Sequence, residues 1–157
     1  MLQYLYMALF CAGAVAIDQL SKAWVVNHIP PDIPVWDGVF HLTFAKNTGA
    51  AFSSLEGQHW LFTLVMVLFI AFIIWEFPKK RMEFTTVERW LIISIFAGGI
   101  GNMIDRLRLG YVVDMVELEF MNFAVFNVAD IFITCGCVLL IAHLILFNKA
   151  FWKEEKK

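Results

Sequence analysis

The chain is 157 residues long, 61% hydrophobic and 16% aromatic, with 17% charged residues and a mean hydropathy of +0.72. Soluble domains are usually about 45–50% apolar, so this composition excludes an ordinary soluble domain and indicates an integral membrane protein. The net charge of −2 offers no basic surface for nucleic acid, and we expect no nucleic-acid partner.

Four apolar stretches are long enough to cross a bilayer, which takes about 17–25 residues each. They cover about residues 4–26, 60–77, 87–104 and 123–147. The third is the least apolar, because glycines and an asparagine lie near its end. No internal repeat or soluble domain is evident. The sequence therefore predicts an all-α polytopic membrane protein with four transmembrane helices, forming a single domain over residues 1–157.

Lysine and arginine residues orient these spans, because cytoplasmic loops carry an excess of both. Basic clusters follow the second span at residues 79–81 and the fourth span within residues 149–157. An even number of crossings places both clusters in the cytoplasm. Both termini are therefore predicted to be cytoplasmic, and segments 27–59 and 105–122 are predicted to face outward.

The outward segment 27–59 is too long for a plain connection. Phe40, Leu42 and Phe44 alternate with polar or small residues, which is typical of a half-buried strand. Prolines before this run disfavour helix, and the sequence NTG at residues 47–49 indicates a turn. We expect a small extracytoplasmic β-sheet that rests on the outer membrane surface.

Two aspartates lie in strongly apolar surroundings. Asp114 lies in the run YVVDMV at residues 111–116, and Asp130 follows Val128 and Ala129 in the last span. An ionisable side chain in the hydrocarbon layer costs at least about 2.5–3.5 kcal/mol, which makes it a functional candidate. Two acids that share one site do not both ionise easily, and a singly protonated pair activates water without a metal.

Helical spacing groups the other polar residues in the first and third spans. Asp18 and Lys22 are four residues apart, so they share one face and are expected to pair, either as a structural ion pair or in the chemistry itself. Asn102, Asp105 and Arg106 lie at the outer end of the third span. Arg106 either takes part in the site, neutralises Asp105 or contacts lipid head groups.

Asn127 and Asp130 are three residues apart near the start of the fourth span, so their side chains point the same way. Asn127 also fits a helix cap. At 1.5 Å per residue, Asp130 is predicted to lie about 10 Å inside the outer end of this span. All these polar groups are then expected in the outer third of the membrane.

Five motifs recur in one order across nearly the whole chain: DQLSK at 18–22, NTGAAF at 47–52, GGIGNMIDR at 98–106, VD at 113–114 and FNVAD at 126–130. Together they closely resemble the bacterial lipoprotein signal peptidases, also called type II signal peptidases. Met115 departs from the family pattern, which usually has Phe after the catalytic aspartate. Because Met keeps the bulk and apolarity, the implied activity is unchanged.

The resemblance implies an aspartyl endopeptidase of the bacterial cytoplasmic membrane, with its active site near the outer face. It would cut prolipoproteins just before a cysteine that carries a diacylglyceryl group. Membrane lipids and the inhibitor globomycin are implied partners, with no cofactor and no metal. By motif match, the catalytic pair is Asp114 and Asp130, substrate-binding residues are Asn47, Gly49, Asn102, Arg106 and Asn127, and structural support comes from Asp18, Lys22 and Asp105.

Two other functional classes compete with this interpretation. A small membrane transporter or channel subunit would also use intramembrane charges, although these groups are expected only in the outer third. A non-enzymatic scaffold could bind membrane partners through the Asp18–Lys22 pair and Arg106. Cys11, Cys135 and Cys137 lie in hydrophobic stretches without metal-ligand spacing, and we interpret them as small apolar residues.

Overall fold

The computed structural model of the chain describes residues 2–29, 32–49 and 84–147, together with six helical residues at positions 64, 68, 69, 71, 72 and 75. The predicted second span at 60–77 otherwise lies outside the described residues, as do the basic residues at 79–81 and 149–157. The described elements, in chain order, are α1 (Leu2–His28), β1 (Ile33–Trp36), β2 (Phe40–Asn47), α3 (Thr86–Leu109), β3 (Val112–Leu118) and α4 (Val128–Leu146).

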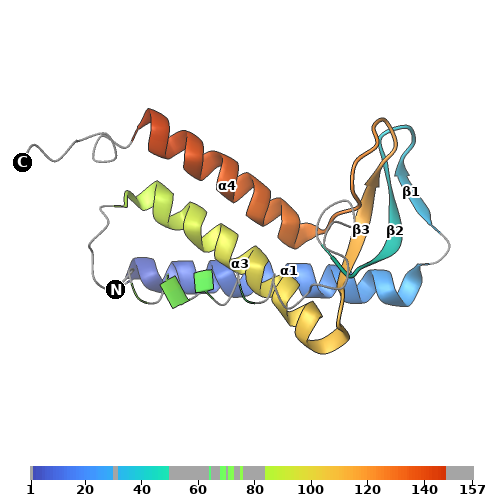
Figure 1. Cartoon of the computed structure of the whole chain (residues 1–157), viewed down its shortest axis with the longest axis horizontal. Coiled ribbons are helices and arrows are strands. Elements are labelled where there is room, and N and C mark those ends of the chain that lie inside the picture. The colour runs from blue at the N-terminus through green and yellow to red at the C-terminus, as the bar shows by residue number, and fades with distance from the viewer. Residues whose placement is uncertain are drawn as a thin grey trace, which may run out of the picture.

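The three described helices are each long and apolar enough to cross a membrane. In Figure 1 they run lengthwise together, and the sheet stands at one end of the bundle. Leu20 on α1 and Val138 and Ile141 on α4 are large apolar side chains that remain exposed. Exposed apolar surface of this kind suits contact with lipid, and the predicted membrane class is confirmed. Long apolar helices lie at three of the four predicted spans.

Helices α3 and α4 pack closely because glycines lie at their contact. A Cβ atom added to Gly98 would overlap the carbonyl oxygen of Ala129 and would lie 2.8 Å from Ile133 Cγ1. On α4, a Cβ atom at Gly136 would lie 2.7 Å from Ile95 Cγ1. Small residues at such positions let helix backbones approach in a membrane, where packing rather than hydrophobic burial drives association.

The sheet is antiparallel with the order β1-β2-β3. Val113 and Met115 on β3 pack against Val25 and Ile29 at the end of α1, which anchors the sheet to the bundle. Ala45 pairs with Asp114, and the β2–β3 register shifts between Leu42 and Ala45. The predicted strand around residues 40–44 is confirmed as β2, whereas the third strand, which carries Asp114, was not predicted.

The predicted bounds of spans three and four need correction. Helix α3 continues beyond residue 104 to Leu109, so Asp105 and Arg106 belong to the helix. Helix α4 begins at Val128, not at residue 123, because Asn127 caps it and the preceding Phe126 pairs with Val116 of β3. Asp130 is therefore in the first turn of α4, not about 10 Å inside a helix. Hydropathy alone did not separate apolar extended chain from apolar helix.

The close contact at Gly98 predicts that Gly98→Ala destabilises the protein by about 1–3 kcal/mol, because the added methyl group pushes α3 away from α4. Gly13→Ala in α1 is the matched control, since a Cβ atom there meets no described atom within 4 Å. Thermal unfolding in detergent should show a lower melting temperature for the first variant and an equal or slightly higher one for the second. Equal melting temperatures for Gly98→Ala and the wild type would contradict this packing account.

Candidate active site

Strand β3 holds Asp114 on the face opposite to the side chains of Val113 and Met115, because successive residues of a strand point to opposite faces. Its carboxylate is only 2% exposed and accepts two side-chain hydrogen bonds. Asn47 Nδ2 donates to Oδ2 at 2.8 Å, and Asn127 Nδ2 donates to Oδ1 at 2.6 Å. Both oxygens of Asp114 are therefore held by amides from outside β3.

Asp130 is positioned by the start of α4. Asn127 is the N-cap, and its Oδ1 accepts from the Asp130 backbone amide at 3.0 Å. In return, Asp130 Oδ2 accepts from the Asn127 backbone amide at 3.1 Å, which completes a capping box. Asn102 Nδ2 on α3 donates to Asp130 Oδ1 at 2.8 Å, so this carboxylate is also held at both oxygens.

Asn127 joins the two aspartates, because it donates to Asp114 through its side chain and to Asp130 through its backbone. The structure thus brings together residues from β2, α3, β3 and α4, which are far apart in the sequence. Asn47 is oriented in turn by Gly49, whose amide donates to Asn47 Oδ1 at 3.0 Å. These contacts leave each carboxylate oxygen with lone-pair capacity for a further donor.

A buried cation lies beneath this pair. Lys22 Nζ is 2.9 Å from Asp18 Oδ2 and 2.9 Å from Asp105 Oδ2, and the predicted Asp18–Lys22 pair is present. Lys22 also donates to Asn102 Oδ1 at 2.8 Å. Because an ammonium group only donates, it fixes the orientation of the Asn102 amide and directs Nδ2 toward Asp130.

The two carboxylates that hold Lys22 also contact the backbone beside the candidate catalytic residues. Asp18 Oδ1 accepts from the Ala129 amide at 2.9 Å, and Asp105 Oδ2 accepts from the Val113 amide at 3.2 Å. A Cβ atom on Gly101 would overlap Asp18 Oδ2, so glycine at this position lets α1 approach α3.

Arg106 reaches from α3 to the segment after β2. Its Nη2 donates to the Gly49 carbonyl at 3.4 Å, and its Nη1 donates to the Asn102 carbonyl at 3.3 Å. Gly49 and Arg106 therefore meet, and a guanidinium group lies beside the chain segment that carries Asn47. An Arg side chain in this place is suited to binding carbonyl groups of a peptide.

Burial raises the pKa of Asp114 from 3.8 to about 6, because removal from water disfavours the ionised carboxylate. The hydrogen bonds from Asn47 and Asn127 act in the opposite direction, and the neighbouring Asp130 raises the pKa further. A carboxyl that changes protonation near pH 6 is suited to exchanging a proton with water. In the described part of the chain, no group of three or more His, Cys, Asp or Glu side chains is arranged to hold a metal ion.

Sequence reasoning missed Gln19, whose side-chain amide contacts Asp18 and Asp105. It lies inside the DQLSK motif, so its position between Asp18 and Lys22 was the available signal. It also missed β3, although β-branched Val112, Val113 and Val116 around Asp114 are typical of a strand.

Comparisons with known proteins give matches over most of the chain. The sequence profile described as Signal peptidase (SPase) II matches residues 10–146. A lipoprotein signal peptidase of Streptococcus pyogenes serotype M2 (strain MGAS10270) is 45% identical over 146 residues, which cover 90% of this chain and 89% of the relative. A lipoprotein signal peptidase of Streptococcus pyogenes serotype M3 (strain SSI-1) has the same identity and coverage.

Two solved structures share the fold. A bacterial membrane enzyme determined by the in meso method at 2.3 Å resolution gives a TM-score of 0.84 with 28% identity, covering 97% of this chain and 93% of that one. Another bacterial membrane enzyme, determined by the same method at 1.9 Å resolution, gives a TM-score of 0.79 with 27% identity, covering 92% of this chain and 94% of that one.

The fold and these relatives define a membrane protease of the aspartic class. The chain belongs to the signal peptidase II family, which cleaves signal peptides from lipoprotein precursors. It is accordingly a bacterial membrane protein that acts on prolipoproteins. The alternative of a small transporter or channel subunit is not supported.

The raised pKa of Asp114 predicts a pH-dependent stability. The folded state favours the protonated carboxyl, so this stabilising contribution is complete below about pH 4 and is lost as the pH rises through about 6. Compared with Asp114→Asn, the wild type should lose about 2–3 kcal/mol over this window, at about 1.4 kcal/mol per pKa unit.

Melting temperatures of both proteins in detergent, measured at several values between about pH 4 and 7, test this prediction. The wild-type value should fall relative to that of the Asn variant as the pH rises. A difference that stays constant across the range would contradict a raised pKa at Asp114.

Proposed function

We propose that Asp114 and Asp130 are the catalytic pair of a peptidase that cuts prolipoproteins immediately before a diacylglyceryl-modified cysteine. The observation that carries this proposal is that Asn127 donates to both carboxylates, which holds two acids together in a largely buried site. Two neighbouring carboxyls of this kind do not both ionise easily, and the pair is expected to share one proton.

Because the pair shares one proton, one carboxyl acts as a base and the other as an acid in the proposed reaction. The ionised carboxylate removes a proton from water, and the resulting hydroxide attacks the scissile carbonyl carbon. This proton then passes to the departing nitrogen as the carbon–nitrogen bond breaks. The protonated carboxyl donates a hydrogen bond to the carbonyl oxygen and stabilises the negative charge that develops there. Amides from Asn47, Asn102 and Asn127 support this role, because donors to the carboxylates fix their orientation before substrate binds.

The other residues of the proposed site either bind the substrate or support the catalytic pair. Arg106 on α3 contacts Gly49 in the segment after β2, and these two residues, together with the three asparagines, would bind the substrate backbone. Asp18, Lys22 and Asp105 form the support beneath them. The inhibitor globomycin, as a cyclic lipopeptide, would occupy the same place as the substrate peptide.

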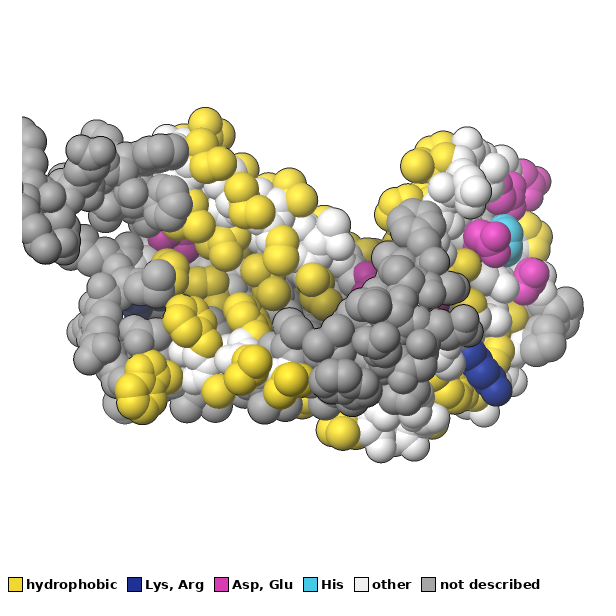
Figure 2. Space-filling model, in the orientation of Figure 1, with side chains coloured by type: hydrophobic (Ala, Val, Ile, Leu, Met, Phe, Trp, Pro, Cys, Tyr) yellow, Lys and Arg dark blue, Asp and Glu magenta, His cyan; other side chains and the backbone are white. Residues whose placement is uncertain are grey.

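The site faces the outer side of the cytoplasmic membrane. Figure 2 shows acidic and histidine side chains gathered over the sheet and apolar side chains along the helices, which suits a sheet in water and helices in lipid. His41 pairs with Glu117 and Glu119 on this polar end. The diacylglyceryl chains of a substrate would remain among membrane lipids while the peptide reaches the carboxylates.

The catalytic assignment predicts that Asp114→Asn and Asp130→Asn each reduce cleavage of a lipid-modified prolipoprotein by at least about 10³-fold. Asn keeps the shape of the side chain but does not exchange a proton. Asp37→Asn in the exposed β1–β2 turn is the control and should cleave normally. Substantial turnover by either site variant, in protein shown to be folded, would contradict the two-aspartate mechanism.

The orientation predicts which positions an impermeant thiol reagent reaches from outside intact cells. After Cys11, Cys135 and Cys137 are replaced, Asp37→Cys in the sheet turn should react, and Phe147→Cys at the far end of α4 should react only after the cells are opened. Labelling followed by mass measurement gives the result. The reverse pattern would place the site on the cytoplasmic side and contradict the proposed orientation.

A further inference from the structure

Gln19 on α1 is a polar side chain next to the Lys22 ion pairs, and the proposed reaction assigns it no role. Its Nε2 donates to Asp105 Oδ1 at 2.9 Å, to the Gly101 carbonyl at 3.1 Å and to Asp18 Oδ2 at 3.2 Å. One amide group therefore contacts both carboxylates that hold Lys22.

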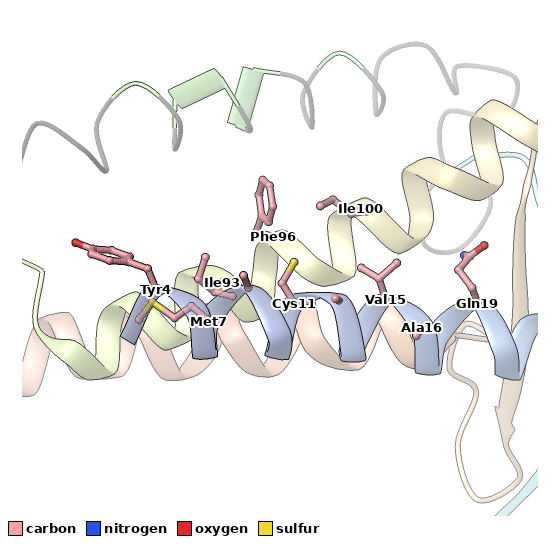
Figure 3. Close-up of a pocket in the computed structure, with 11 residues that line it drawn as sticks. Tyr4, Met7, Cys11, Val15, Ala16, Gln19, Ile93, Phe96 and Ile100 are labelled. Carbon is pink, nitrogen blue, oxygen red and sulfur yellow. The ribbon is translucent and has the colours of Figure 1, made fainter. Parts of the chain in front are cut away.

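The surroundings of Gln19 differ from those of the other network residues. It lies at one end of an apolar groove of about 760 Å³ between α1 and α3. Figure 3 shows Gln19 at the end of this groove nearest the sheet, with the apolar side chains of Val15, Cys11 and Met7 following along α1. Gln19 thus lies between the buried ions and this apolar groove.

Asp18 and Asp105, the two carboxylates that Gln19 contacts, also hold the backbone next to the proposed catalytic aspartates. Asp18 binds the amide of Ala129, next to Asp130, and Asp105 binds the amide of Val113, next to Asp114. Any change in the separation of the two supporting carboxylates is therefore transmitted to the backbones that carry the proposed catalytic pair. Lys22 attracts both carboxylates, while Gln19 contacts them from the groove side.

We infer that Gln19 is a positioning residue, which sets the separation of Asp114 and Asp130 by bracing Asp18 against Asp105. This inference rests on the proposed catalytic pair. Gln19 touches neither aspartate of that pair, and its effect passes through the two supporting carboxylates. Because it acts on the spacing of reacting groups, its loss should lower kcat and leave KM nearly unchanged.

Gln19→Met tests the inference, because methionine keeps the length and volume of the side chain and removes its hydrogen-bond donor. With a lipid-modified prolipoprotein in detergent, kcat should fall by about fivefold to a hundredfold, and KM should change by less than about twofold. Assays run well below the melting temperature of each variant separate this effect from unfolding.

Gln3→Met is the matched control on the same helix. The side-chain amide nitrogen of Gln3 is buried without a hydrogen-bond partner among the described residues, and it lies at the opposite end of α1 from Gln19. Its replacement should leave kcat and KM at wild-type values. A Gln19→Met protein with wild-type kcat, or with raised KM alone, would overturn the positioning role.

Gln19→Glu tests whether the charge balance between Asp18 and Asp105 affects the reaction, and it gives a pH signature that Gln19→Met lacks. The ionised glutamate repels Asp18 and Asp105, whereas its protonated form donates to one of them. The ratio of variant to wild-type kcat/KM should therefore rise as the pH falls, and a constant ratio would contradict the inference. Failure of the wild type to cleave prolipoprotein would instead overturn the proposed function and this inference with it.

Discussion

The buried charge of Lys22 is the constraint on which the rest of the structure depends. An ammonium group that is 3% exposed is stable only when paired, and here it has Asp18 and Asp105 as partners. Those partners come from two helices, so pairing fixes α1 against α3. Their remaining contacts, to the amides of Ala129 and Val113, bring α4 and β3 to the same place. The candidate site is thus assembled around this buried ion cluster, for which we propose a supporting role.

Asparagine side chains connect this buried ion cluster to Asp114 and Asp130, the proposed catalytic pair. Each amide accepts through its oxygen and donates through its nitrogen, so it connects one charged or polar group to another. Asn102 accepts from Lys22 and donates to Asp130, and Asn47 accepts from Gly49 and donates to Asp114. A carboxylate in the same positions would repel the aspartates. An aliphatic residue would leave them without oriented donors.

Much of the fold and of the site could be predicted from the sequence. The lengths of apolar stretches predicted the three helices that the structure describes, and helical spacing predicted the Asp18–Lys22 pair. The start of α4 was misplaced because Phe123 and Phe126 are as apolar as helix residues, although they precede the helix. Contacts between distant segments, such as Asn47 with Asp114, left no periodic signal. The motif resemblance assigned Asn47 and Asp114 to one site, whereas the hydrogen bond between them became evident only in the folded structure.

The capping box of α4 links the geometry of the proposed catalytic pair to the folding of the first turn of that helix. Asp130 and Asn127 close the first helical turn with the same groups that orient the pair. When that turn frays, the two carboxylates separate, even if the rest of the bundle stays intact. The backbone amide of Asp130, which is protected by Asn127 Oδ1, therefore reports the population of assembled sites through its hydrogen-exchange rate. A substitution that loosens this turn would reduce the fraction of active molecules without touching the substrate.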